Sequence, residues 1–572
     1  MFLVTSSSHE TRVHQMITDN YHIADQFSLL SKLMDIHGEN SFKTKSYSIA
    51  AFTIEKLPEQ LSTLPEDKIF AIKGIGNTIG KKIMEVLESG ELPVLKEYIA
   101  KTPPGVIEML NIKGLGPKKI ATVWKEMEIE SIGELVYACN ENRLLLYKGF
   151  GEKTQNNIRE TIEFYLRSQG SHLYAEIESY ALSVDKKLKE YFSGNKFELA
   201  GEWRRQLEII NQLEWVTTAD VAVLKTFFEK NNFTISAQDS GKIIFKGPEN
   251  ISLCFLISDD ASFYSKLFQS SCSDEFREAW NKTFNEDGDG TYTSEEEIFL
   301  RKKIHFIAPC LREKASIIEK AKNGALPAVI QPGDIKAIIH SHSNWSDGSN
   351  TIEEMARACI EKGYEYLVIS DHSKSAFYAN GLNEERIREQ HRYVDELNQR
   401  LSPFKIFKSI ECDILNDGNL DYSDNILSTF DLVIASVHSN LKMNEEKAMM
   451  RLMRAIENPH TTILGHMTGR LLLSRPGYPV NHKKIIDACA ANKVVIELNA
   501  HPRRLDIDWR WLDYALEKGI LISIDPDAHT IDGYHDITYG VLVAQKSGLT
   551  PEKNLSSFNL KQMEAFLAEK KK

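Results

Sequence analysis

From Asp334 to the C-terminus, short apolar runs alternate with helical stretches seven times. This regular alternation constrains the fold strongly, because strands that are separated by helices favour a parallel sheet with the helices packed outside it. The sequence therefore predicts a parallel β/α arrangement, most simply a barrel of seven strands. The predicted strands are residues 337–339, 366–369, 404–410, 432–437, 462–464, 494–498 and 521–524.

Side chains of the types that bind metals follow six of these seven runs, at the end where β/α barrels build their active sites. His340 and His342 stand two residues apart, so both imidazoles can lie on one side of an extended chain. Asp347 follows this pair within a loop. A single histidine of this kind could be an ordinary core residue, but that interpretation does not explain why metal-binding residue types follow six of the seven strands. The remaining candidates are Asp371, His372, Glu411, His438, His466, Asp527 and His529.

These candidates offer nitrogen and oxygen ligands without sulfur, which suits Mn, Zn or Fe ions, and the sequence does not choose among the three. They outnumber the ligands that one ion needs, so we expect two or three ions. Such a cluster generates a metal-bound hydroxide and clamps a phosphoryl oxygen, which favours phosphoester hydrolysis. Histidines without this placement are expected to be ordinary core or surface residues: His460, His482, His501 and His535.

Three turns in the N-terminal region share one pattern, Lys-Gly-apolar-Gly, and each precedes a helical segment. They are Lys73-Gly74-Ile75-Gly76, Lys113-Gly114-Leu115-Gly116 and Lys148-Gly149-Phe150-Gly151. A turn of this kind brings backbone N–H groups and a helix N-terminus close to a phosphate oxygen. One copy is weak evidence, since most such turns are plain turns, but three copies favour a nucleic-acid module and resemble helix-hairpin-helix motifs.

The composition limits how the chain could bind nucleic acid. A formal net charge of -12 argues against binding through diffuse positive charge, so any contacts with DNA must be local. The seven cysteines are scattered, which argues against a disulfide framework and against a thiolate zinc site. No secretory signal begins the chain, and no apolar run reaches the roughly 20 residues of a membrane span. We therefore expect a cytoplasmic protein.

The length of 572 residues predicts several domains rather than one core. The middle region mixes helix and strand, with strand-like runs at 196–201, 233–236, 242–246 and 251–257. A short linker with proline and glycine follows it. The predicted divisions are an extension (1–15), a helical helix-hairpin-helix region (16–168), a mixed α+β domain (172–322) and the barrel (334–572).

Five segments of the last domain resemble the PHP (polymerase and histidinol phosphatase) domain. They are His340-Ser341-His342, Trp345-Ser346-Asp347-Gly348, Ser370-Asp371-His372-Ser373, Val437-His438-Ser439 and Asp527-Ala528-His529. The resemblance implies a three-metal site with nine ligands, and every position matches. These implied ligands are His340, His342, Asp347, His372, Glu411, His438, His466, Asp527 and His529.

Residues 465–473, continuing to Arg475-Pro476-Gly477-Tyr478, are similar to the PHP domain that is fused to bacterial family X DNA polymerases. The resemblance extends over nearly the whole chain, with the helical region and a nucleotidyltransferase-like middle domain in the family order. It implies a Mn-dependent 3′ to 5′ exonuclease that cleaves 3′ ends or abasic sites. Arg470, Arg475 and Arg504 are expected to hold substrate phosphates through their planar forks, with surface salt bridges as an equal alternative.

The middle domain departs from the family pattern where a working polymerase binds its metals. The family has Gly-Ser-x-x-Arg-Arg, then Asp-x-Asp, then a third Asp on a neighbouring strand; this chain has Gly201-Glu202, Gln212-Leu213-Glu214 and Ser252. One carboxylate of three remains, so two-metal catalysis is doubtful and we expect a degenerate polymerase site. A shifted alignment that uses another carboxylate, such as Asp220, is the alternative.

Two further motifs are weaker. Lys82 stands where related eukaryotic enzymes have a Schiff-base lysine, although a phosphate-binding lysine is the favoured interpretation. The stretch Asn285-x-Asp287-x-Asp289-Gly290 nearly matches a calcium loop, but a solvated acidic loop is favoured.

The sequence thus predicts a monomeric DNA repair nuclease that acts on gapped, recessed or abasic DNA. The alternatives are a functional gap-filling polymerase with a PHP nuclease, a histidinol-phosphate-type phosphatase with a small-molecule substrate, and a non-catalytic DNA-binding scaffold.

Overall fold

The protein forms two compact units in a computed structural model, residues 1–135 and residues 136–572. The structure describes residues 20–57, 59–112, 114–167, 170–247, 251–285 and 290–570. The predicted extension, residues 1–15, lies outside these ranges, as does most of the calcium-loop-like stretch. Among the described helices, none combines the length and the apolar character needed to cross a membrane.

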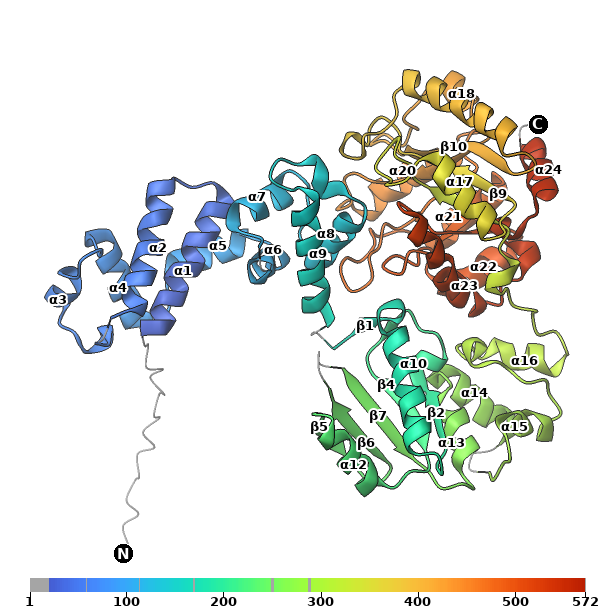
Figure 1. The fold of residues 1–572 in the computed structure, drawn as a ribbon, viewed down its shortest axis with the longest axis horizontal. Coiled ribbons are helices and arrows are strands. Elements are labelled where there is room, and N and C mark those ends of the chain that lie inside the picture. The colour runs from blue at the N-terminus through green and yellow to red at the C-terminus, as the bar shows by residue number, and fades with distance from the viewer. Residues whose placement is uncertain are drawn as a thin grey trace, which may run out of the picture. The chain divides into compact units, whose positions relative to one another are not determined.

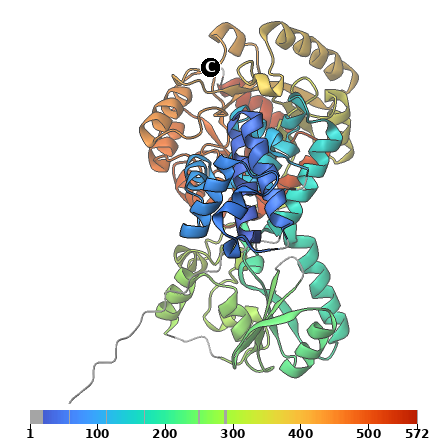
Figure 2. The ribbon, with the colours of Figure 1, turned by 90° about the vertical axis from the view of Figure 1, so that its left-hand side faces the viewer.

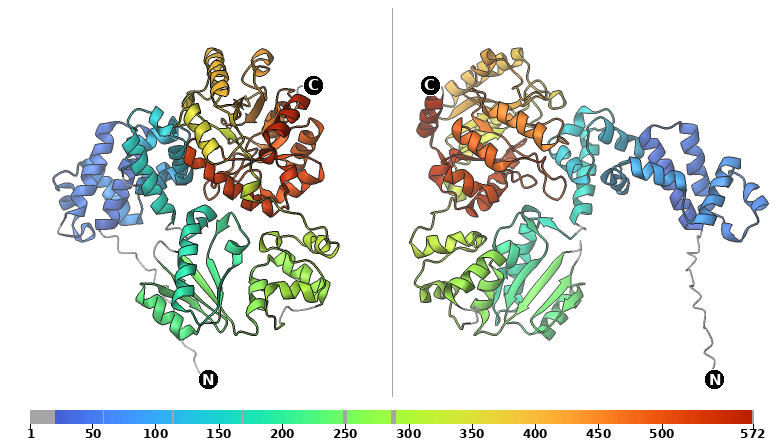
Figure 3. Two further views of the ribbon diagram at one scale, coloured as in Figure 1. Left: turned by 45° about the vertical axis from the view of Figure 1, so that its right-hand side comes forward. Right: turned by 180° about the vertical axis from the view of Figure 1, so that it is seen from behind.

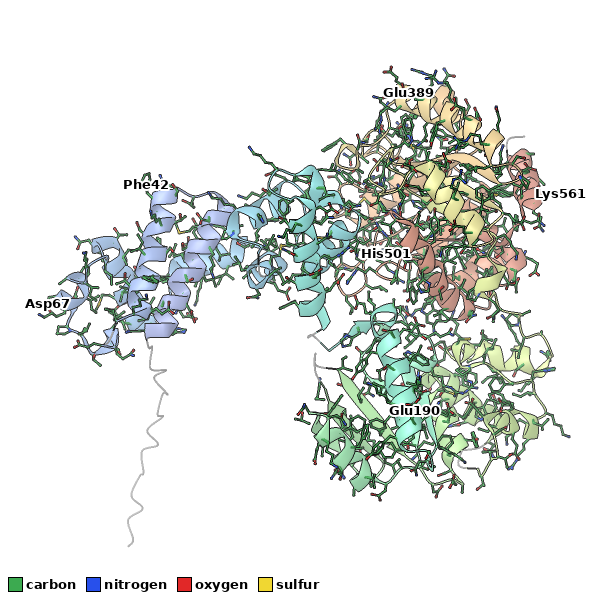
Figure 4. The ribbon with its side chains drawn as sticks, in the orientation of Figure 1. Phe42, Asp67, Glu190, Glu389, His501 and Lys561 are labelled. Atoms are coloured by element: carbon green, nitrogen blue, oxygen red, sulfur yellow. The ribbon has the colours of Figure 1, made fainter. Side chains whose placement is uncertain are left out.

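The first unit is helical, as the sequence predicts (Figure 1). Its longest helix, α1, packs against α2, α5 and α7 and buries Phe27 and Leu30 at their contacts. Phe42, near the start of α2, projects into solvent (Figure 4) and is 82% exposed. The helices are α1 (Asn20–His37), α2 (Ser41–Glu55), η1 (Leu61–Thr63), α3 (Glu66–Phe70), α4 (Asn77–Ser89), α5 (Pro93–Lys101), α6 (Pro104–Glu108), η2 (Met109–Asn111) and α7 (Pro117–Lys125), with α8 (Ile132–Asn140) at the boundary of the two units.

The three glycine turns have one backbone conformation. Gly74, Gly114 and Gly149 all have φ between +91° and +99°, a left-handed conformation that glycine adopts without a steric cost. In each turn the second glycine immediately precedes a helix, and its carbonyl accepts the first helical hydrogen bond from the residue four positions on. The third turn leads from η3 (Arg143–Leu146) into α9 (Glu152–Arg167), in the second unit. The repeated sequence pattern therefore reflects a repeated structure.

A five-stranded sheet forms the middle domain, in the order β2-β4-β7-β6-β5 (green in Figure 2). Only β4 and β7 run parallel. The four strands expected from the sequence are present, but β4 was not predicted, because its five residues form neither a continuous apolar run nor a regular alternation. The strands are β2 (Phe197–Ala200), β4 (Leu213–Thr217), β5 (Thr234–Gln238), β6 (Lys242–Lys246) and β7 (Ser252–Ile257), with a separate short pair, β1 (His172–Leu173) and β3 (Ile209–Ile210).

Helices cover both faces of this sheet. Residues of α10 and α12 pack with Trp215 and Phe255 on one face, and residues of α13 pack with Val216 on the other. A separate helical core around Trp280 and Phe299 completes the domain. The helices are α10 (Tyr174–Tyr191), α11 (Gly201–Arg204), α12 (Val221–Lys230), α13 (Phe263–Ser270), α14 (Asp274–Phe284), α15 (Glu295–Arg301), η5 (Pro309–Leu311) and α16 (Ser316–Lys322).

The C-terminal domain is a parallel barrel with strand order β14-β13-β12-β11-β10-β9-β8, so the prediction of seven strands is confirmed. A parallel bridge between Ser341 and Ala528 nearly closes it. Helices surround the strands in both views of Figure 3. The strands are β8 (Ala337–Ser341), β9 (Tyr366–Ile369), β10 (Lys405–Asp413), β11 (Leu432–Ser436), β12 (Ile463–Leu464), β13 (Val495–Asn499) and β14 (Ile522–Asp525).

The N-terminal end of the barrel is sealed by apolar packing. First residues of several strands, among them Ala337 and Val495, form one core with Met563 and Leu567 of the last helix. This leaves the opposite, C-terminal end for polar side chains. The helices are η6 (Pro332–Asp334), α17 (Ile352–Glu361), η7 (Phe377–Ala379), α18 (Glu384–Arg400), α19 (Asp424–Leu427), α20 (Glu445–Ile456), α21 (His482–Ala491), η8 (Trp509–Trp511), α22 (Leu512–Glu517), η9 (Ile531–Asp536), α23 (Ile537–Gln545), η10 (Pro551–Lys553), η11 (Leu555–Ser557) and α24 (Leu560–Lys570).

Candidate metal centre

All nine candidate ligands implied by the PHP resemblance come together at the C-terminal end of the barrel. Parallel strands end at the same edge, so residues that are 187 positions apart in the sequence become neighbours, as His342 and His529 show, with ring centroids 4.3 Å apart. In β8 the pairing register shifts between Ile338 and Ser341, and His340 has a φ of 58°. Ala337 and Ile339 contribute to the barrel interior, so a regular alternation of side chains would turn His340 away from it. The register shift interrupts this alternation. His340 therefore faces the cluster.

The ligand atoms form three overlapping groups, and within each group they lie within 4.8 Å of one another. Glu411 joins two of the groups, with Oε1 3.0 Å from His438 Nε2 and Oε2 2.9 Å from His372 Nδ1. His466 Nε2 lies 2.9 Å from Glu411 Oε1. The groups are His342, Asp347, His372 and His529; His340, His342, Glu411 and Asp527; and His372, Glu411 and His438.

The donor set fits divalent metal ions. None of the nine side chains is more than 10% exposed. Within the described residues, both carboxylate oxygens of Asp347, Nε2 of His340 and Nε2 of His529 are buried and make no hydrogen bond. Buried polar atoms are nearly always partnered, so atoms left in this state point to a cation as their partner.

Electrostatics favour ionised carboxylates in the cluster. Burial opposes the charged form of Glu411, but His438, His340 and His372 outweigh it and hold the pKa of Glu411 well below its ordinary value. Burial likewise disfavours charged His342, and with His529 and His372 nearby it lowers the pKa of His342 to about 3. A neutral imidazole and an ionised carboxylate are the forms that bind metal ions.

Asp371, which also follows a predicted strand end, does not join the three groups. Its carboxylate accepts hydrogen bonds from Ser343 N (2.8 Å), Ser343 Oγ (2.7 Å), Ser346 Oγ and Gln390 Nε2. These bonds fix the loop between His342 and Asp347. Asp371 therefore supports the ligands rather than joining them.

Four buried polar residues around the ligands were missed by the sequence reasoning. Asp413 Oδ1 lies 2.6 Å from His438 Nδ1. Asp506 accepts hydrogen bonds from Thr468, next to the His466 segment. Glu497 and Asn499 end β13, the one strand that was assigned no ligand. Polar residues on a buried, otherwise apolar strand are the signal that could have identified them.

The three candidate phosphate-binding arginines differ in their surroundings. Arg470 bonds Asp508 and two backbone carbonyls, and Arg475 donates to the carbonyl of Gly469. Arg504 lies closer to the cluster, with Nε 3.7 Å from Asp527 Oδ2 and 2.8 Å from the Tyr137 hydroxyl. Arg504 is thus the arginine of the three that the structure places beside a candidate ligand.

The middle-domain residues named from the sequence also lie together. Gly201, with φ +60°, begins α11, and Glu214 packs so closely that a Cβ at Gly201 would lie 2.5 Å from its carboxylate carbon. Glu202 accepts two hydrogen bonds from Asn211, and Gln212 donates to Glu214. Burial raises the pKa of Glu214. Ser252 begins β7, which pairs with the strand of Glu214.

The histidines expected to be ordinary lie outside the three groups. His482 stacks on Trp511, His535 packs against Tyr539, and His460 lies 3.7 Å from Asp424. His501, labelled in Figure 4, packs edge-on against Tyr137. Lys82 is paired with Glu85 at 2.6 Å.

Comparison with known proteins agrees with this architecture. The PHP domain family matches residues 339–501, a helix-hairpin-helix domain family matches residues 18–92, and a SAM-like helix-hairpin-helix tandem matches residues 106–163. The "DNA polymerase/3'-5' exonuclease PolX" of Bacillus subtilis is 33% identical over 559 residues, which cover 93% of this chain and 96% of that protein. The chain belongs to the PolX family. The resemblance to family X polymerases with a C-terminal PHP domain is thereby confirmed.

A second group of relatives is matched by less than half of this chain. A probable phosphatase of Thermoanaerobacter sp. is 25% identical over 258 residues, which are 42% of this chain and 97% of that protein. The PHP domain is a metal-dependent hydrolase domain, so the family, the match to residues 339–501 and the donor set all imply divalent metal ions. The PolX architecture adds the helix-hairpin-helix regions and the middle domain to this hydrolase domain.

Proposed function

We propose that this PolX member is a metal-dependent phosphoesterase that cleaves DNA at 3′ ends or abasic sites, and that its barrel holds two or three Mn, Zn or Fe ions. The observation that carries the proposal is the cluster itself. Eight of the nine candidate ligands form three overlapping groups, the ninth, His466, contacts Glu411, and several donor atoms make no hydrogen bond. Nitrogen and oxygen donors without sulfur suit these metals.

The residues that would hold the ions have separable roles. Glu411 would bridge two ions, because its two oxygens contact different histidines. His342 and His372 each belong to two groups and would hold neighbouring ions together. When bound, the ions supply a hydroxide at neutral pH and stabilise the charge that develops on the phosphoryl oxygens. Burial of the ligands excludes competing water and strengthens these interactions.

The DNA would be held by local contacts rather than by overall charge. The glycine turns at Gly74–Gly76, Gly114–Gly116 and Gly149–Gly151 present a helix N-terminus without side-chain obstruction, which suits phosphate oxygens. Arg504 would position the phosphate next to the metals through its planar fork. Tyr137 of α8 holds Arg504 and so links the helical region to the cluster.

We further propose that the polymerase site of the middle domain is degenerate and that the domain serves to grip DNA. Gln212 and Ser252 carry no charge, and Glu202 would repel a triphosphate. Arg204 and Arg205 are committed to Glu295 and Glu313. A working polymerase remains the alternative, and primer extension with Mg or Mn separates the two.

The experiment that tests the nuclease is a Mn-supplemented digest of gapped, recessed and abasic DNA by the full chain. The wild type is expected to shorten or nick these substrates, and EDTA should stop it. A His340→Ala/His342→Ala variant should lose at least about 10³-fold in rate, because two groups lose a ligand. Equal digestion by this variant would assign the activity to another site or to a contaminant.

A small-molecule phosphatase is the second candidate, favoured by a probable phosphatase of Thermoanaerobacter sp. that is matched over 97% of its length by 42% of this chain. Hydrolysis of small phosphomonoesters should then exceed hydrolysis of DNA ends at equal enzyme concentration. The helix-hairpin-helix matches favour DNA, because a small substrate gives them no role.

A further inference from the structure

The strand that supplies no candidate ligand, β13, contacts three of the nine: His340, His466 and Asp527. Glu497 and Asn499 are two residues apart near its C-terminal end and are fully buried. Their neighbours on either side are β12, which leads to His466, and β14, which leads to Asp527. Burying two polar side chains costs free energy unless they are hydrogen-bonded, so their hydrogen-bond partners indicate what they do.

Glu497 is bonded to ligand residues through both of its oxygens. Its Oε2 lies 2.5 Å from His340 Nδ1, and its Oε1 accepts hydrogen bonds from the backbone N of His466 at 3.0 Å and from Asn499 Nδ2 at 3.0 Å. With Nδ1 of His340 engaged in this way, Nε2 is the ring nitrogen directed at the cluster, 3.3 Å from both Glu411 Oε1 and Asp527 Oδ1.

Asn499 extends the same network to the far side of the cluster. Its Nδ2 donates to Asp527 Oδ2 at 3.0 Å as well as to Glu497. One short segment of β13 thus contacts ligands from β8, β12 and β14. Glu497 itself lies outside the three groups of candidate ligand atoms.

The two ligand side chains that this segment bonds both have strained backbones. His340 has φ +58° and Asp527 has φ +53°, and no other residue among the nine has a positive φ. Residues without the freedom of glycine persist in this conformation only where the surrounding structure fixes them. The bonds from Glu497 and Asn499 supply such a constraint at the side chains of these two residues.

We propose that Glu497 and Asn499 are positioning residues of the metal centre, which orient His340 and Asp527 before any ion binds. Glu497 sets the tautomer of His340, so that Nδ1 carries the proton and Nε2 is the free donor. Asn499 holds one oxygen of Asp527 and leaves the other for the ion. This inference rests on the proposed function in one respect, that the cluster holds metal.

Metal binding by the full chain tests the proposal without DNA. The wild type, Glu497→Gln and Asn499→Ser are stripped with chelator and titrated with Mn²⁺, and the bound stoichiometry and Kd are measured. Loss of an outer carboxylate of this kind weakens metal affinity by about 10- to 100-fold. We expect Glu497→Gln to weaken the ion held by His340 to that extent and to leave the other ions bound. Asn499→Ser should show a smaller loss.

Glu208→Gln is the matched control, since Glu208 is a buried carboxylate that bonds Trp509 and Arg510 rather than a candidate ligand. Wild-type Kd in this control and a lowered affinity in both test variants support the proposal. Equal stoichiometry and Kd in all four proteins overturn it, as does a wild type that binds no Mn²⁺. If the wild type binds Mn²⁺ yet leaves DNA intact, the proposed function fails while the positioning role stands. Should Glu497→Gln not fold, Asn499→Ser decides the result.

Discussion

The barrel cluster and the middle-domain site each contain a buried carboxylate, Glu411 and Glu214, and the two have opposite electrostatic surroundings. In the barrel, histidines surround Glu411 and hold its pKa well below the ordinary value. In the middle domain, burial raises the pKa of Glu214, and its nearest polar partner is the neutral Gln212. One site stabilises an ionised carboxylate without a metal ion, and the other disfavours it.

The same contrast holds for the charges nearby. Arg204 forms a two-pronged ion pair with Glu295, at 2.9 and 2.7 Å, and Arg205 pairs with Glu313 at 2.9 Å. These guanidinium groups are satisfied within the protein. Donor atoms of the barrel cluster, such as the two oxygens of Asp347, lack hydrogen bonds. The charged groups of the middle-domain site are thus paired within the protein, whereas donor atoms of the barrel cluster are left without hydrogen bonds.

One matched substitution in each site tests the contrast between the two carboxylates most directly. Glu411→Gln should lower metal-dependent hydrolysis of recessed DNA by about 10³-fold, because the bridging charge contributes several kcal/mol of transition-state stabilisation. Glu214→Gln should leave the rate within about twofold, since its carboxyl is already disfavoured as an anion. Initial rates with saturating Mn²⁺ provide the measurement.

Primer extension by the same two variants is the control. We expect no template-directed synthesis by either variant or by the wild type. Synthesis at ordinary polymerase rates that disappears in Glu214→Gln would contradict the degenerate site and restore Glu214 as a catalytic carboxylate.

The buried ion pairs of the middle domain should matter for stability rather than for hydrolysis. Glu295 is 5% exposed and bonds both Arg204 and Arg312, and Arg312 is fully buried. Glu295→Gln leaves the buried Arg312 without its charged partner, which typically costs about 3–5 kcal/mol, so we expect about that loss in the free energy of unfolding. Hydrogen exchange of α15 and η5 would report it, and wild-type protection would contradict it.

The pH dependence of this domain follows from the same carboxylate. Burial opposes its charge, but Arg312 and Arg204 outweigh burial and lower the pKa of Glu295 to about 2. A pKa that is depressed in the folded state stabilises the fold above the unfolded value of 4.5, and this stabilisation is lost as pH falls from 4.5 towards 2. The loss is about 3 kcal/mol. The difference between wild type and Glu295→Gln should therefore shrink across this interval; a constant difference would contradict it.

The barrel could be predicted from the sequence because its signal is repeated. The seven apolar runs of the sequence correspond to the seven strands of the barrel, and residues of the types that bind metals follow the C-terminal ends of the strands. What could not be predicted depends on contacts across strands. The contact from Glu497 to His340 joins residues 157 positions apart, and the register shift that turns His340 inward and the bond from Asn499 to Asp527 depend on neighbouring strands, so no local pattern encodes them. Strand β4 was missed because its five residues show neither a continuous apolar run nor a regular alternation.

The smallest expected effect concerns the glycine turns, which should contribute to DNA binding and not to the chemistry. Gly116 precedes α7 with φ -80°, and an added Cβ would meet no atom within 4 Å. Gly116→Ala should therefore fold normally, while its methyl group obstructs a phosphate that approaches the helix N-terminus. We expect roughly fivefold weaker binding of gapped DNA, about 1 kcal/mol, since one charge-assisted hydrogen bond is impaired. Hydrolysis of a small phosphodiester should stay at the wild-type rate, because the barrel is untouched. Unchanged DNA affinity in a Gly76→Ala/Gly116→Ala double variant would show that these turns are structural and that the DNA is held elsewhere.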